Sequence, residues 1–232
     1  MKPLALVFDA YGTLYDVHSV IALCERFWPG KGAALSQLWR TKQLEYTWQR
    51  SLMRRYAAFS RITEAGLRYA CAALGLELSD AQAAALMQQY LNLSLYPDAM
   101  PALEALRGHK LAILSNGSPD LLDPLVAASG LDRVLDAVLS VAEVKIFKPD
   151  PRVYQIAVDR LRVPKQAIGF VSSNCWDACG AKAFGFRTYW INRAGAPLDA
   201  LDVTPDHTIA RLTDLAALVD QSEAGSNKSN LN

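Results

Sequence analysis

Short apolar runs alternate with amphipathic stretches along most of the chain. Five of these runs have the length of strands that are buried on both faces of a parallel sheet. They are Leu4–Phe8, Lys110–Leu114, Ala137–Val141, Ile168–Val171 and Thr188–Ile191. A weaker run at His207–Ala210 predicts a further strand at one edge of the sheet.

Helical patterns lie between these runs, and Gly130, Pro164 and Gly185 mark helix ends. The helices predicted here are Met100–Arg107, Pro119–Ala128, Pro151–Leu161 and Trp176–Phe184. Strands that alternate with helices predict an α/β fold, with a Rossmann-like parallel sheet and right-handed crossovers.

One long stretch, from about Asp16 to Tyr96, contains no convincing strand. Its pattern predicts helices at Val17–Phe27, Ala33–Ser60, Thr63–Leu74 and Ser79–Leu93. Roughly 80 helical residues are far more than a crossover needs. One interpretation of this stretch is a long loop that carries extra helices. We favour a helical cap domain inserted after the first strand, because so much apolar helical surface needs its own core.

These patterns give the expected domain boundaries. Residues 1–15 and 96–220 form the Rossmann-like core domain, and residues 16–95 form the helical cap domain. Residues 221–232 are polar and rich in Ser and Asn, so we expect a disordered tail.

Composition narrows the functional classes. The 232 residues are 51% hydrophobic and carry a formal net charge of +1, which argues against nucleic-acid binding and a polybasic membrane anchor. No signal peptide or membrane span is evident, so we expect a cytoplasmic protein. The four cysteines are expected to be reduced, and Cys175 and Cys179 alone are too few ligands for a zinc site.

Polar residues follow four of the predicted strands, where ligands bind in open parallel sheets. Asp9 and Thr13 follow the first strand, Ser115 follows the second, Lys148 lies beyond the third and Asp177 follows the fourth. Each residue alone has an ordinary explanation as a turn, a helix cap or a surface charge. Together they predict a carboxylate, a hydroxyl, an ammonium and a second carboxylate at one place.

The chain resembles the haloacid dehalogenase superfamily, and within it the L-2-haloacid dehalogenases. The matching segments are DAYGTLYDVHS at 9–19, WRTKQLEYTW at 39–48, LSNGSP at 114–119, KPDPRVY at 148–154 and FVSSNCWD at 170–177. The resemblance covers nearly the whole chain except the tail. It implies a hydrolase that acts on carbon–halide bonds, a small halogenated carboxylic acid as substrate, and a homodimer.

Most members of this superfamily are magnesium-dependent phosphatases, which differ from this chain at the predicted site. Those enzymes use a second aspartate to protonate the leaving group, and Tyr11 stands at that position here. A phenol with a pKa of about 10 is a poor substitute for a carboxylic acid. Ser172 and Ser173 stand where the phosphatases place acidic metal ligands. We therefore expect no metal and no cofactor.

Carbon–halogen cleavage needs a nucleophile behind the carbon and a polar cradle for the halide. Asp9 can act as the nucleophile through an ester, and Lys148 would keep it ionised. Thr13 could bind Asp9, while Ser172 and Asn174 could hold Asp9 and Lys148 in register. The backbone amides of Ala10 and Tyr11, with Ser115, would bind the substrate carboxylate. The resemblance assigns the same positions.

The remaining candidates depend more on the resemblance, which places the halide-abstracting arginine at Arg40. Leu44, Phe59 and Trp176 could form an apolar wall around the substrate alkyl group, or could be plain core packing. Asn116 is expected to assist at the halide or the carboxylate, and Tyr154 to line the site through its hydroxyl. Asp177, oriented by neighbours such as Asn174, is the candidate base for ester hydrolysis, with Lys148 as its rival.

The sequence therefore predicts hydrolysis of short-chain L-2-haloacids to D-2-hydroxy acids with inversion, through a covalent ester on Asp9. The alternatives are a magnesium-dependent phosphatase of the same superfamily and a catalytically silent binding domain. The preferred halogen, including fluoride, the chain length of the substrate and the turnover rate are left open by the sequence.

Overall fold

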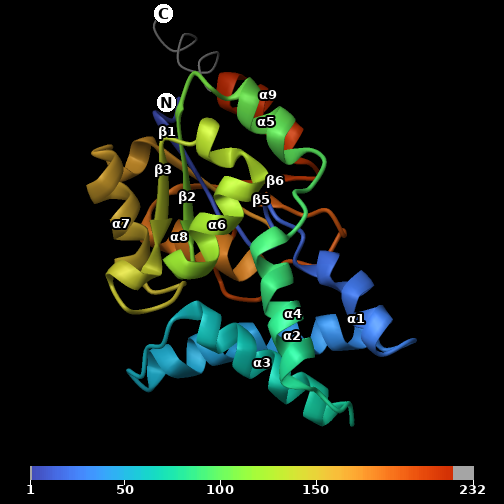
Figure 1. Cartoon of the computed structure of the whole chain (residues 1–232). Helices are drawn as coiled ribbons and strands as arrows, with labels where there is room; N and C mark the ends of the chain where they lie inside the picture. Colours follow the sequence, from blue (N-terminus) through green and yellow to red (C-terminus); the bar gives the residue numbers. More distant parts are fainter. Residues whose placement is uncertain (1, 222–232) are drawn as a thin grey trace, which may run out of the picture.

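The computed structural model describes residues 2–221, and its centre is a six-stranded parallel sheet (Figure 1). The strands are β1 (Ala5–Phe8), β2 (Lys110–Ser115), β3 (Ala137–Ser140), β4 (Ile168–Ser172), β5 (Arg187–Ile191) and β6 (His207–Ile209). Their order in the sheet is β3-β2-β1-β4-β5-β6. All six predicted strands are confirmed, the weak edge strand included, and so is the α/β fold class.

Strand β1 lies in the middle of the sheet and is completely buried. Phe8 pairs with Ile113 of β2 and with Val171 of β4, so these strands end close to one another. Residues that follow β1, β2 and β4 are therefore delivered to the same edge of the sheet, as parallel strands require.

Helices of the core connect the strands and cover both faces of the sheet (Figure 1). They are α5 (Ala99–Ala105), α6 (Pro119–Ser129), α7 (Pro151–Leu161), α8 (Cys175–Phe184) and α9 (Leu215–Gln221), with short 3-10 turns between them. Helices α6 and α8 end at Gly130 and Gly185, which take positive φ angles of 74° and 110°. These left-handed residues let the chain turn back towards the next strand.

The insertion folds as a cluster of helices beyond one end of the sheet (Figure 1). It contains η1 (Val17–Val20), α1 (Ile21–Phe27), α2 (Gly32–Leu52), α3 (Phe59–Ala73), α4 (Asp80–Gln89) and η2 (Tyr90–Asn92). The prediction of one helix over 33–60 is wrong. Helix α2 stops at Leu52, Arg54 takes a left-handed φ of 55°, and α3 starts at Phe59.

The chain enters and leaves the cap at neighbouring points. Tyr15 and Leu95 form an antiparallel bridge, and the Tyr96 N–H donates to the Leu14 carbonyl at 2.9 Å. The core–cap boundaries that we propose, 15/16 and 95/96, fall at this bridge. Of the tail predicted at 221–232, Gln221 ends α9 and the other residues lie outside the described part of the chain.

No helix in residues 2–221 is both long enough and apolar enough to cross a membrane.

Candidate functional site

Asp9 is the first residue after β1 and begins a tight loop. The Ala10 carbonyl accepts hydrogen bonds from the N–H groups of Thr13, Leu14 and Tyr15. Gly12 takes a φ of 95°, a conformation that residues with a side chain rarely adopt. The loop therefore fixes the direction of the Asp9 carboxylate, which is only 8% exposed.

Lys148 lies between two carboxylates. Its ammonium is 3.0 Å from Asp9 Oδ1 and 2.9 Å from Asp177 Oδ2, and the lysine side chain is completely buried. Burial alone would lower the pKa of Lys148, but the charges of Asp177 and Asp9 outweigh it and raise the pKa. Lys148 is thus held as a cation, because a buried ammonium is stable only when it is paired.

Asp177 is buried deeper than Asp9 and is oriented by Tyr154. The Tyr154 hydroxyl donates to Asp177 Oδ1 at 2.8 Å, and also lies 3.2 Å from the Asp177 carbonyl. Burial raises the pKa of Asp177 to about 6, against the opposing charge of Lys148. Tyr154 is itself fully buried, and its hydroxyl meets the site through Asp177.

The second oxygen of Asp9 binds two uncharged donors. Asp9 Oδ2 accepts from Asn174 Nδ2 at 2.9 Å and from Thr13 Oγ1 at 3.1 Å. The Thr13 hydroxyl also accepts the Ser173 N–H at 2.8 Å, which holds Thr13 against the β4–α8 loop. With Lys148, three side chains therefore fix the Asp9 carboxylate.

Two expectations about the β4–α8 loop need correction. Ser172 has no hydrogen bond to Asp9 or Lys148 in residues 2–221; its Oγ accepts the Asn174 N–H at 3.1 Å. Ser172 thus acts on Asp9 only through Asn174. The Asn174 side chain binds Asp9 and not the Asp177 carboxylate, whose orientation comes from Lys148 and Tyr154.

Arg40 reaches the site from the cap. Its Nη2 donates to the Tyr11 carbonyl at 3.1 Å and lies 3.5 Å from Asn174 Oδ1. Its Nη1 donates to Gln43 Oε1 at 2.7 Å. The structure therefore brings Arg40 of α2 against the loop that carries Asp9, although 31 positions separate the two residues.

A third group of predicted residues offers donors to an anion. No hydrogen-bond partner within residues 2–221 occupies the N–H groups of Ala10 and Tyr11. Ser115 is fully buried, and its Oγ accepts the Gly117 N–H at 2.9 Å, which leaves the hydroxyl proton to donate. In Asn116, by contrast, the side-chain oxygen accepts a hydrogen bond from the backbone N–H of Lys148 at 3.0 Å.

The three residues of the predicted apolar wall have different neighbours in the structure. The rings of Phe59 and Tyr11 are 5.3 Å apart, and Phe59 is buried. Trp176 packs edge-on against Trp48, with 5.4 Å between ring centroids. Leu44 lies half-buried on α2, one turn after Arg40. The Tyr11 hydroxyl is buried and has no hydrogen-bond partner among residues 2–221, and burial raises its pKa well above the usual value.

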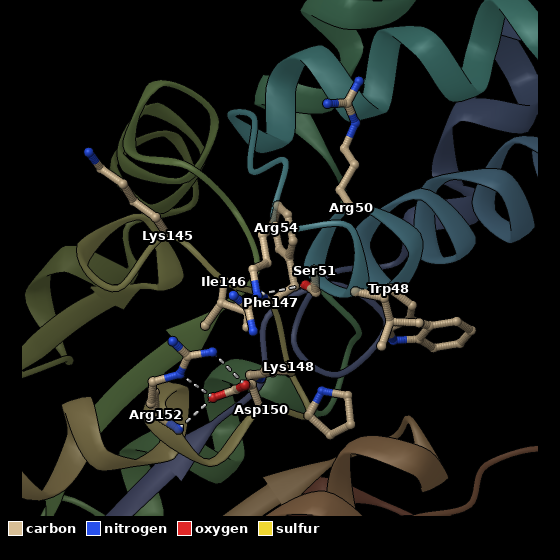
Figure 2. A pocket seen from close by; sticks show the side chains of 12 residues that line it. Trp48, Arg50, Ser51, Arg54, Lys145, Ile146, Phe147, Lys148, Asp150 and Arg152 are labelled. Atoms are coloured by element: carbon tan, nitrogen blue, oxygen red, sulfur yellow. Dashed lines mark hydrogen bonds and ion pairs between the residues drawn. The ribbon is translucent and has the colours of Figure 1, made fainter.

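A separate cavity of about 770 Å³ adjoins the site (Figure 2). It lies between the end of α2 and the segment that leads into α7. Among the predicted site residues, Lys148 borders it. Figure 2 shows Arg152 paired with Asp150, while Arg50 and Lys145 extend away from the cavity. Asp9, Arg40 and Asn174 do not line it, so this cavity is distinct from the space around the nucleophile.

The carboxylates do not form an evident metal cage. Within residues 2–221, no group of three or more His, Cys, Asp or Glu is placed to hold a metal ion. Asp9 and Asp177 both bind the ammonium of Lys148, which occupies the place between them. The arrangement at this place is two buried carboxylates that share one lysine ammonium.

Sequence reasoning missed two residues that support the site. Ser173 binds Thr13 and also donates to the Gly12 carbonyl at 2.6 Å. Gln43 is completely buried and binds Arg40. Helical spacing offered a signal for Gln43, because residues three apart lie on the same face of a helix.

Comparisons with known proteins agree with this geometry. The family model of haloacid dehalogenase-like hydrolases matches residues 4–185. The (S)-2-haloacid dehalogenase H-109 of Pseudomonas putida is 48% identical over 219 residues, which cover 93% of this chain and 98% of that protein.

Two solved structures are similar over nearly their whole length. The L-2-haloacid dehalogenase RSc1362 has 47% identity and a TM-score of 0.92, and the match covers 95% of this chain and 100% of that one. The L-2-haloacid dehalogenase of Xanthobacter autotrophicus with chloropropionic acid covalently bound has 41% identity and a TM-score of 0.89, with coverages of 94% and 98%.

Proposed function

Because the chain belongs to the haloacid dehalogenase-like hydrolases, we propose that it hydrolyses short-chain L-2-haloacids to D-2-hydroxy acids. The observation that carries this proposal is the position of Asp9. Its carboxylate is fixed by Lys148, Thr13 and Asn174, and the guanidinium of Arg40 lies against the same loop. A held nucleophile and a nearby cation are what displacement of a halide requires.

The first step is a displacement at carbon. An oxygen of Asp9 donates an electron pair to C2 of the substrate, the carbon–halogen bond breaks, and its electrons leave with the halide. Because the halide is the anion of a strong acid, it needs no proton. Arg40 stabilises the charge of the departing halide, and the product is an ester between Asp9 and the 2-carbon.

Substrate orientation comes from the free donors beside Asp9. The N–H groups of Ala10 and Tyr11, together with the Ser115 hydroxyl, bind the substrate carboxylate. With the carboxylate anchored and attack restricted to one line, one enantiomer presents its carbon correctly. A single displacement inverts that carbon, so an L-2-haloacid yields a D-2-hydroxy acid.

The second step is hydrolysis of the ester. Asp177 takes a proton from water, and the oxygen of that water attacks the side-chain carbonyl carbon of Asp9. The acyl–oxygen bond then breaks, and the hydroxy acid leaves with the proton that Asp177 held. The second proton of the water stays on the Asp9 carboxyl group and is released to solvent, which restores the Asp9 carboxylate. A carboxyl with a pKa of about 6 suits this role, since it is ionised at neutral pH and is still basic enough to accept a proton.

The same geometry argues against the two alternatives. A phosphatase needs an acid for the leaving alkoxide, and the Tyr11 phenol, whose pKa burial raises further, is a weak one. A silent binding domain has no need for two carboxylates on a buried lysine, since burying these charges is costly.

Halide release from L-2-chloropropionate separates the three functions. We expect chloride release at an equal rate with and without exhaustive EDTA treatment. Activity that is lost on chelation and restored by Mg²⁺ would favour the phosphatase mechanism, as would hydrolysis of a phosphate ester. No release of chloride by the folded protein would overturn the proposed function.

We extend the proposal to the assembly and setting of the chain. Leu52 and Met53 at the end of α2 are 85% and 61% exposed, and Tyr69 of α3 is 44% exposed. This apolar cap surface supports the expected homodimer, which light scattering would measure; a monomer at micromolar concentration would contradict it. The four buried free cysteines support a reducing, cytoplasmic setting.

A further inference from the structure

Every hydrogen-bond partner of Arg40 in residues 2–221 is an uncharged oxygen. They are the Tyr11 carbonyl, the Asn174 side-chain carbonyl and Gln43 Oε1. No carboxylate in this part of the chain lies within ion-pair distance of the guanidinium. The positive charge of Arg40 is therefore held in place without being neutralised.

Gln43 makes the shortest of these contacts, at 2.7 Å, and is itself fixed from behind. Its Nε2 donates to Thr63 Oγ1 of α3 at 2.7 Å, and the Thr63 hydroxyl donates to the Phe59 carbonyl at 2.8 Å. Gln43 and Thr63 are both completely buried. Since the Thr63 proton is already used, Thr63 must accept from Gln43, and the amide oxygen is forced to face Arg40.

From this chain of contacts we infer that Gln43 is a positioning residue, which aims Arg40 at the leaving halide while leaving its charge uncompensated. The inference rests on the proposed function. A glutamate has the same length and would reach the guanidinium as well. It would, however, form a buried ion pair and offset the charge that the departing halide needs.

Three variants and one control test this role. Gln43→Glu keeps the length of the side chain but adds a negative charge, and Gln43→Met removes the acceptor at similar volume. Thr63→Val removes the support behind Gln43 without touching Arg40. Thr47→Val is the control: Thr47 is equally buried on α2, and its hydroxyl binds the Leu44 carbonyl and not the Arg40 cluster.

The readout is single-turnover halide release with enzyme in excess, from 2-chloropropionate and 2-bromopropionate, beside thermal unfolding. We expect Gln43→Glu to slow chloride release about 100-fold, as loss of a preorganised charge-stabilising donor does. Bromide is the better leaving group, so its release should slow less and the bromide-to-chloride rate ratio should rise. Chloride release by Gln43→Met should slow less than that by Gln43→Glu. The rate and the ratio of Thr63→Val should change in the same direction as those of Gln43→Glu, and Thr47→Val should keep the wild-type ratio.

The possible results are distinguishable. If Gln43→Glu keeps the wild-type rate and ratio, Gln43 does not position Arg40. If every variant, Thr47→Val included, slows in proportion to its loss of thermal stability with an unchanged ratio, Gln43 is structural only and the inference fails. Absence of halide release by the wild-type protein would instead overturn the proposed function itself.

Discussion

Tyr154 and Asp177 form a buried pair in which the phenol donates to the carboxylate Oδ1 at 2.8 Å. The Lys148 ammonium connects this pair to Asp9, because it binds both carboxylates. Burial and the charge of Asp9 raise the pKa of Asp177, while the Lys148 ammonium and the Tyr154 hydrogen bond oppose this rise. This arrangement makes the second half of the proposed reaction sensitive to pH.

Dehalogenation should show an acidic limb near pH 6. Asp177 must be ionised to accept a proton from water, and burial raises its pKa to about 6. The rate of ester hydrolysis should therefore fall about tenfold for each pH unit below that value. A kcat profile between pH 4.5 and 8.5 measures it. An acidic limb that survives replacement of Asp177 by Asn would belong to another group.

Replacing Tyr154 with Phe should move this limb to higher pH. The hydrogen bond from Tyr154 favours the ionised carboxylate, so its loss leaves Asp177 with a still higher pKa. We expect kcat to fall about three- to tenfold at pH 6 and to change little at pH 8.5. Tyr189→Phe provides the control, because its buried hydroxyl has no partner in the described structure. An equal loss at both pH values would contradict the electrostatic role.

Asp9 should exchange an oxygen with water during turnover. In a single turnover with enzyme in excess in H₂¹⁸O, the first hydroxy acid should carry ordinary oxygen from Asp9. Peptide mass mapping should then find one heavy oxygen on the segment that contains Asp9. Label in the first product with an unlabelled Asp9 would show that water attacks the carbon directly.

Replacing Arg40 with Lys should slow turnover about 100-fold with the fold intact. The ammonium keeps the charge but loses the planar set of donors that binds Tyr11, Gln43 and Asn174. Arg50→Lys is a matched control on the same helix, since Arg50 donates only to the Arg55 carbonyl in the described residues. Near-normal halide release by Arg40→Ala would place Arg40 outside the chemistry.

Removing the Ser115 hydroxyl should weaken discrimination between enantiomers. Wild-type protein should consume the L form of 2-chloropropionate and leave the D form, which chiral chromatography of product and remaining substrate can follow. Ser115→Ala deletes one of three anchors for the carboxylate, and we expect KM to rise about tenfold as a charge-assisted hydrogen bond is lost. Equal wild-type rates on both enantiomers would refute the anchoring scheme.

The local pattern of hydrophobic and polar residues was sufficient to predict the sheet and to bring together much of the site. Runs such as Leu4–Phe8 are buried on both sides, so their hydrophobicity identifies them, and parallel strands bring the residues after them together. Asp9, Lys148 and Asp177 meet for this reason. That argument needs only strand ends and no knowledge of side-chain directions.

Features that depend on tertiary contacts could not be predicted from this local pattern. The segment Met53–Ala58 contains no Gly or Pro, and nothing in it marks a helix end. The break follows from packing: Ser51 Oγ accepts the Phe147 N–H at 3.2 Å, so the end of α2 is bound to the core. Tyr154 and Gln43 depend in the same way on partners, Asp177 and Thr63, that are distant in sequence.

The bridge between Tyr15 and Leu95 holds the two connections of the cap together at one place. Arg40 belongs to the cap and Asp9 to the core, so the contact between Arg40 and the loop that carries Asp9 crosses the boundary between the two. Other hydrogen bonds also join the cap to the core, among them those from the Ser60 N–H to Ser118 Oγ and from the Phe147 N–H to Ser51 Oγ. The two groups that the proposed reaction needs, the nucleophile and the cation for the halide, therefore come from different domains, so the active arrangement depends on how the cap rests on the core.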